Sequence, residues 1–190
     1  MNRQKAIQNL LLIAGIGVSS GTVFKLSLPE EISVNELPHK KLLLAELADT
    51  IIPRTDTPGA KDAGVEDFII KMIRDCTDSK TQHNFLRGLS GLEKYSTDSY
   101  GKPFTSCSEA QRTDILKHFE SRATYRINII NKINKKLLGV PFFVKLRDLT
   151  VEGYCTSMLG ATKGMAYDYI PVTFQACIPI TPNQKAWATK

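Results

Sequence analysis

Residues 142–172, FFVKLRDLTVEGYCTSMLGATKGMAYDYIPV, begin as an amphipathic helix and then place very small residues along one helical face. Steps of three, four, three and four residues keep these positions on one stripe. The stripe consists of Thr150, Gly153, Ser157, Gly160 and Gly164. A glycine inside a helix costs about 0.5–1 kcal/mol relative to alanine, so several on one face need a compensating cause.

Two causes can account for the stripe. Another backbone can pack unusually close, within this chain or on a partner, or the helix can end with Gly160 or Gly164 as its first residue beyond the C-cap. We expect close packing around Gly153 and termination at one of the two later glycines. The stripe is flanked by Tyr154, Tyr167 and Tyr169, which either anchor an interface or lie in the core with their hydroxyl groups satisfied.

The loop PRTDTPGA at residues 53–60 is rich in turn formers. Asp56 is expected to close this loop through local hydrogen bonds or to contact a partner. Arg54 is expected either to pair with a partner carboxylate or to be solvated. The candidate partner contacts combine these two loop residues with part of the stripe, its three tyrosines and Thr156. The set is Gly153, Tyr154, Thr156, Ser157, Gly160, Tyr167, Tyr169, Arg54 and Asp56.

Apolar residues recur at helical spacing along most of the remaining chain. Two capping boxes, Ser79-x-x-Gln82 and Ser108-x-x-Gln111, predict helix starts, and residues 127–137 predict a further helix. Sustained alternation of period two is missing apart from a short stretch after Tyr169. The sequence therefore predicts a mainly α fold, an irregular helical bundle of about six helices with an extended, Pro-containing C-terminal tail.

Residues 1–27 have a different composition from the rest of the chain, with the order of basic and apolar residues that is typical of an export signal. Arg3 and Lys5 precede an apolar stretch at residues 6–18, and the first acid is Glu30. The layout favours the twin-arginine (Tat) route, although Gln4 stands beside Arg3. An amphipathic or buried N-terminal helix is the alternative. We expect residues 28–190 to form a single helical domain.

Several classes of function have no support in the sequence. The net charge is +6, but the cations are scattered, so no nucleic-acid partner is expected. The four cysteines form neither C-x-x-C nor C-x-x-C-H, and no G-x-G-x-x-G follows a strand pattern. His39, His83 and His118 lie far apart in the sequence. No catalytic, cofactor-binding or metal-binding residue is therefore predicted.

A set of short motifs, in order along the chain, resembles the gluconate 2-dehydrogenase subunit 3 family. They are residues 51–60 (IIPRTDTPGA), 153–157 (GYCTS), 160–162 (GAT), 169–172 (YIPV), 177–179 (CIP) and 185–188 (KAWA). The leader is similar to the family's twin-arginine leaders, with Gln4 where a second arginine is usual. The resemblance implies a small accessory subunit of a periplasmic, membrane-associated sugar or polyol dehydrogenase.

The resemblance also implies the partners. The large subunit would be an FAD-containing flavoprotein of the glucose-methanol-choline class, and a multihaem cytochrome c is a further subunit that receives electrons in such complexes. The hypothesis is a non-catalytic small subunit needed for assembly, stability and export of the catalytic subunit. It would be periplasmic and associated with the inner membrane only through partners or an uncleaved leader. The rival hypotheses are a standalone periplasmic binding or envelope protein and an enzyme using Asp56, His118 or the tyrosines.

Overall fold

The chain divides into two compact units, Met1–Glu30 and Glu31–Lys190. The computed structural model describes residues 34–123, 139–170, 177, 179, 180 and 182–188, all of which belong to the second unit. The predicted leader at 1–27 and the predicted helix at 127–137 lie outside these described residues.

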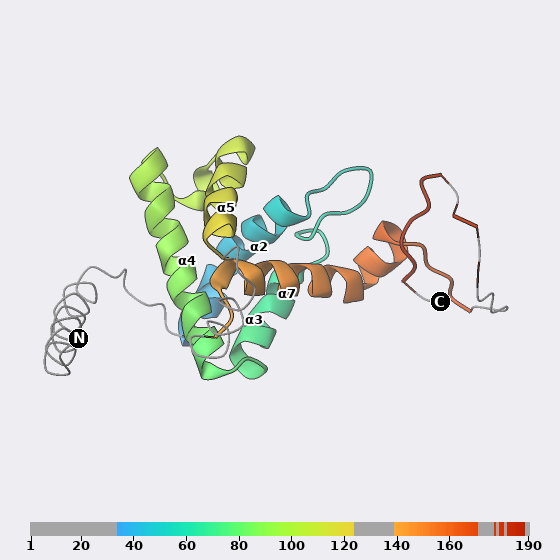
Figure 1. Cartoon of the computed structure of the whole chain (residues 1–190), viewed down its shortest axis with the longest axis horizontal. Helices are drawn as coiled ribbons and strands as arrows, with labels where there is room; N and C mark the ends of the chain where they lie inside the picture. The colour runs from blue at the N-terminus through green and yellow to red at the C-terminus, as the bar shows by residue number, and fades with distance from the viewer. Residues whose placement is uncertain (1–33, 124–138, 171–176, 178, 181, 189–190) are drawn as a thin grey trace, which may run out of the picture. The chain divides into compact units, whose positions relative to one another are not determined.

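The regular elements of the described residues are all helical, which confirms the predicted all-α bundle (Figure 1). Five are α-helices, and three are short helical segments. The elements are η1 (Val34–Lys40), α2 (Lys41–Ile51), α3 (Val65–Asp75), α4 (Ser79–Tyr100), η2 (Phe104–Ser106), α5 (Glu109–Ala123), α7 (Phe142–Thr156) and η3 (Gly160–Gly164).

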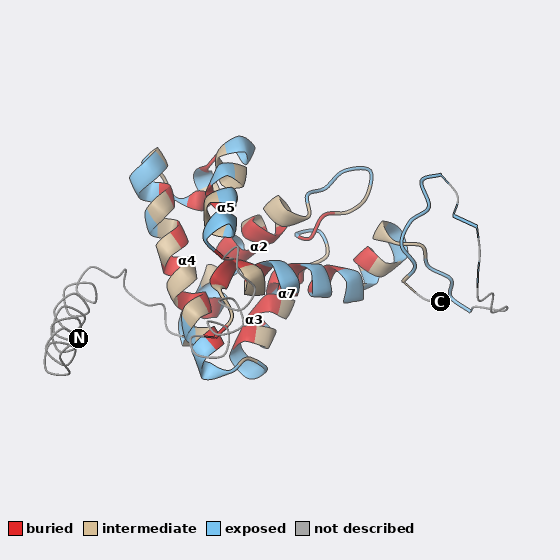
Figure 2. Ribbon diagram, in the orientation of Figure 1, coloured by how far each residue is buried: buried red, intermediate tan, exposed pale blue. Residues whose placement is uncertain are grey.

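Helix α7 is the centre of the core. It packs most extensively against α3 and α4 and also contacts α2 and α5, and Figure 1 shows it running roughly crosswise to α4. Its buried residues recur at helical spacing, so one face of the helix is turned inward (Figure 2). At its start, the Phe142 ring lies 5.3 Å from Phe85 of α4 and 5.9 Å from Phe119 of α5, centroid to centroid. Burial of this apolar face against the neighbouring helices stabilises the bundle.

The predicted capping box at Ser79 is wrong by one residue. The N-cap of α4 is Asp78, whose side chain accepts a hydrogen bond from the Thr81 N–H at 3.1 Å. Gln82 does not cap its own helix, because its side-chain amide donates to the Ile73 carbonyl at 3.0 Å. Gln82 thus satisfies a carbonyl at the end of α3, where the helix offers no N–H of its own.

The predicted capping box at the start of α5 is confirmed. The Gln111 N–H donates to the Ser108 hydroxyl at 3.4 Å, and the Ser108 N–H donates to the Gln111 side-chain carbonyl at 3.0 Å. These reciprocal bonds satisfy two backbone donors at the helix end. They direct Ile115 and Leu116 into the core, as their spacing predicted.

Helices α4 and α7 approach closely at Gly88. A methyl group built on Gly88 would overlap the Cβ and Cγ atoms of Phe142. Gly91, one turn further along α4, has no atom within 4 Å of the corresponding position. The two glycines of one helix therefore have different physical roles.

We expect substitutions at these glycines to change stability in opposite directions. Gly88→Ala should lower the free energy of unfolding by about 1–3 kcal/mol, because the added methyl displaces Phe142. Gly91→Ala should raise it by about 0.5–1 kcal/mol, because alanine favours the helix and meets no neighbour. Urea unfolding followed by circular dichroism measures both values. Equal effects of the two substitutions would contradict the described packing.

Candidate partner interface

The close packing predicted around Gly153 is present, and its partner is this chain's own helix α3. A Cβ atom on Gly153 would lie 2.8 Å from the Phe68 ring and 2.9 Å from a methyl group of Val65. Real Cβ contacts are essentially never that short. Gly153 is therefore small because α3 occupies the space beside it.

Helix α7 ends earlier than predicted. Its last residue is Thr156, and Ser157 has the extended backbone of the C-cap, so termination of α7 at Gly160 or Gly164 is wrong. The Ser157 hydroxyl donates to the Tyr154 carbonyl at 2.8 Å and accepts from the Gly160 N–H at 2.9 Å. A serine side chain can compete with helical hydrogen bonds in this way. The stripe is consequently broken at Ser157, and Gly160 and Gly164 do not continue the face of α7.

The two later glycines surround Tyr154. They bound η3, a single π-helical turn. A Cβ on Gly164 would lie 3.0 Å from Cζ of the Tyr154 ring, and one on Gly160 would overlap the Tyr154 carbonyl. Tyr154 itself is buried, and its hydroxyl donates to the Pro58 carbonyl at 2.7 Å. Of the two interpretations of Tyr154, the structure shows the core residue with a satisfied hydroxyl.

Gly153, Tyr154 and Gly160 are thus buried by this chain's own residues. Thr156, Tyr167 and Tyr169 are exposed, while Ser157 is half-buried. Any partner therefore meets a surface made of the exposed residues, and a direct contact through Thr156, Tyr167 or Tyr169 stays a prediction.

The loop between α2 and α3 is closed by local hydrogen bonds. The Thr55 N–H donates to the Thr57 carbonyl at 3.0 Å, and the Thr55 hydroxyl donates to the Asp56 carboxylate at 3.0 Å. Arg54 pairs with Asp62 at 3.4 Å. Arg54 and Asp56 are both exposed, so their predicted role as partner contacts stays open to test.

An ion cluster that the sequence did not predict joins α2, α5 and the same loop. Glu46 accepts from Lys61 at 2.6 Å and forms a short ion pair with Arg112. Arg112 also donates to the carbonyls of Phe104, at 3.3 Å, and Thr105, at 2.6 Å. The side chains of Glu46 and Arg112 are only 12% and 19% exposed, so the pair is partly shielded from water.

This environment changes the acidity of two carboxyl groups. Burial disfavours the charge of Glu46, but the Lys61 hydrogen bond and the Arg112 charge outweigh it and hold the pKa of Glu46 below its ordinary value. Burial and the nearby Glu46 charge raise the pKa of Asp49. Both carboxylate oxygens of Glu46 are paired, one with Lys61 and one with Arg112, so Glu46 has a structural role.

Exposed apolar side chains collect after the end of α7. Among the described residues, the large exposed hydrophobic side chains before Met158 are Leu42 and Val151. The others are Met158, Tyr167, Tyr169, Ile170, Ile180 and Trp187. We call the described part of residues 165–188 the C-terminal arm, which Figure 2 shows coloured almost entirely as exposed.

Backbone hydrogen bonds join the two ends of the C-terminal arm. Ala166 and Trp187 form a parallel bridge, in which the Ala166 N–H donates to the Ala186 carbonyl and the Ala188 N–H to the Ala166 carbonyl, each at 2.8 Å. The Lys185 ammonium donates to the carbonyl of Lys163, in η3, at 2.9 Å. These bonds tie the two ends of the arm to each other and to the end of η3, and the predicted extended course of the tail stays a prediction.

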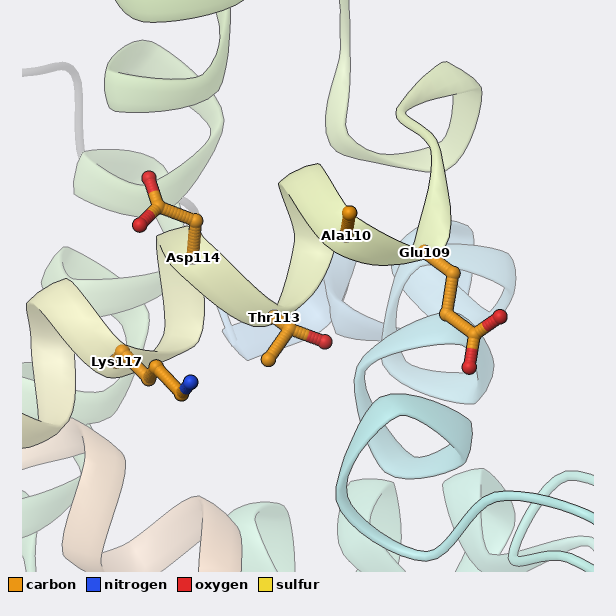
Figure 3. A pocket seen from close by; sticks show the side chains of 5 residues that line it. All are labelled: Glu109, Ala110, Thr113, Asp114 and Lys117. Carbon is orange, nitrogen blue, oxygen red and sulfur yellow. The ribbon is translucent and has the colours of Figure 1, made fainter.

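A hollow of about 480 Å³ lies along the outer side of α5 (Figure 3). Its lining residues are Glu109, Ala110, Thr113, Asp114 and Lys117. Figure 3 shows the charged side chains pointing in different directions, and Asp114 accepts from the Tyr100 hydroxyl at 2.6 Å, which raises the pKa of Tyr100 to about 12. The hollow is open, and its polar groups do not converge as those of an active site do.

The described histidine and cysteine side chains are not grouped into a site. His118 stacks on Tyr95 with a centroid separation of 4.1 Å. In the part of the chain that the structure describes, no three or more His, Cys, Asp or Glu side chains are grouped to hold a metal ion. The four cysteines are free; Cys107 is buried, and Cys76, Cys155 and Cys177 are exposed. Within the described ranges, no helix combines the length and the hydropathy of a membrane span.

The described residues form an all-α domain whose helices pack around one apolar core and whose C-terminal arm exposes apolar side chains. The model of the gluconate 2-dehydrogenase subunit 3 family matches residues 38–172, and the chain belongs to this family. The resemblance noted in the sequence is thereby confirmed, and membership makes the chain a subunit of a gluconate 2-dehydrogenase type of complex. Comparisons with curated proteins and with solved structures gave no significant match.

We expect Glu46→Gln to lower the free energy of unfolding by about 1.5–3 kcal/mol at pH 7, the value of hydrogen bonds between charged groups. Because the folded-state pKa of Glu46 is lowered, its contribution is present above the unfolded pKa of about 4.3 and is lost as pH falls through the folded value. Urea unfolding should therefore show a smaller difference from the unchanged protein at pH 3 than at pH 7.

The control for this prediction is Glu152→Gln, at an exposed position of α7. It should change stability by less than about 0.5 kcal/mol at either pH. A Glu46→Gln difference that is the same at both pH values would show that the charge of Glu46 does not stabilise the fold.

Proposed function

We propose that the chain is the non-catalytic small subunit of a periplasmic, membrane-associated, FAD-dependent sugar or polyol dehydrogenase. Its role is the assembly, stability and export of a large catalytic subunit of the glucose-methanol-choline class. Family membership over residues 38–172 supports a place in a multi-subunit dehydrogenase complex. In this proposal FAD is bound by the large subunit, and a multihaem cytochrome c receives the electrons.

The observation that carries the proposal is the collection of exposed apolar side chains after α7. Burial of such side chains against a partner stabilises a complex by about 25 cal/mol per Å² of apolar surface removed from water. A small subunit that binds only the folded large subunit stabilises it by mass action. At a free concentration one hundred times the dissociation constant, the stabilisation is about 2.7 kcal/mol.

Export of the large subunit would depend on its binding to this chain. The leader-like residues 1–27 carry one signal for this chain. A large subunit without its own leader would cross the inner membrane bound to this chain. The complex would then meet the membrane through a cytochrome subunit or through a leader that is not removed.

The experiment is purification from the periplasm of the native host with a tag at the C-terminus of this chain. The expected result is a yellow complex that contains a large flavoprotein and oxidises a sugar with an artificial electron acceptor. The matched control is the same host without this chain, where the large subunit should be depleted from the periplasm. A colourless chain purified alone, with sugar oxidation unchanged in the deletion strain, would instead indicate a standalone envelope protein.

A further inference from the structure

The exposed apolar side chains of the C-terminal region are few but strongly exposed. Tyr169, Ile180 and Met158 have 82%, 88% and 80% of their surface accessible, and Ile170 has 66%. Comparable exposure on the described part of the bundle is found at Leu42, with 61%. Aromatic residues and methionine are enriched in protein interfaces, and tyrosine is among the residues that most often dominate the binding energy.

The charge of the same region indicates what kind of surface it meets. Residues 157–188 contain three charged residues, Lys163, Asp168 and Lys185. A helix or arm that binds anionic lipid carries many cations beside its apolar residues, and a nucleic-acid site does too. The complementary surface is therefore an apolar, weakly charged protein surface.

The fold also gives the arm a defined starting direction. The buried Tyr154 hydroxyl holds the end of α7 to the Pro58 carbonyl, and η3 turns around the Tyr154 ring. The arm begins directly after η3 and returns to it through the Ala166–Trp187 bridge and the Lys185 hydrogen bond to Lys163. A surface held in place before binding loses less conformational entropy on binding.

From these observations we infer that the C-terminal arm and the adjoining Met158 form the docking surface for the large flavoprotein subunit. This inference rests on the proposed function, since that function supplies a larger protein partner in the same complex. It keeps Tyr167 and Tyr169 from the interface expected from the sequence but leaves out the stripe around Gly153, which is filled by α3 and Tyr154. Tyr169 and Ile180 are the central contacts, and Met158 and Ile170 extend them.

The test measures the dissociation constant between the purified full-length chain and the purified large subunit by biolayer interferometry. The variant is Tyr169→Ser combined with Ile180→Ser, and the control is Leu42→Ser on α2. Both replace exposed apolar side chains, so their thermal unfolding should match that of the unchanged chain. The expected result is at least about tenfold weaker binding for the double variant and unchanged binding for Leu42→Ser.

The outcomes separate this inference from the proposed function. If the unchanged chain does not bind the large subunit, the proposed function falls, and the inference falls with it. If it binds and the double variant binds within about twofold of it, only the docking surface is wrong. Weaker binding by Leu42→Ser, or a dimer of the isolated chain that the double variant abolishes, would also overturn the inference. Should the double variant unfold, each single substitution is measured in its place under the same criteria.

Discussion

The fold depends on close approaches that only small side chains allow around α7. Phe142 fits against α4 because Gly88 has no side chain, and α3 reaches α7 because Gly153 has none. At the other end, Gly160 and Gly164 leave room for the backbone and ring of Tyr154, respectively. Since close-packed interiors do not yield by a methyl group without cost, these positions determine how the helices meet. They also determine where the chain leaves the bundle.

Polar contacts add to this packing around the loop between α2 and α3, where Glu46, Lys61 and Arg112 form an ion cluster. Glu46 and Arg112 are joined across 66 positions of sequence, and the Tyr154 hydroxyl and the Pro58 carbonyl are joined across 96. The Tyr154 bond holds the loop to α7, the Lys61–Glu46 pair holds it to α2, and Arg112 joins α2 to α5. The charges of Glu46, Lys61 and Arg112 are paired within the chain, so the cluster stabilises the fold without a partner.

The helices could be predicted because capping residues and apolar spacing are local in the sequence. The reason for the small residues could not, because it lies in contacts with residues distant in the sequence. The capping box of Ser108 and Gln111 could be predicted because its two side chains lie within one helical turn. Asp78 displaced the box expected at Ser79, and Gln82 turned to the carbonyl of Ile73, which sequence spacing does not reveal. Likewise, the break at Ser157 depends on a side chain bonding to the backbone. Exposed aromatics among few charges were the one available signal for the arm.

The most direct test of this account is hydrogen–deuterium exchange of the chain alone and in complex with the large subunit. Amides around Gly153 and Tyr154 should be protected already in the free chain, because α3 and η3 cover them. Complex formation should add protection at residues 165–170 and 182–188. Protection that appears around Gly153 only in the complex, with the arm unchanged, would contradict the account.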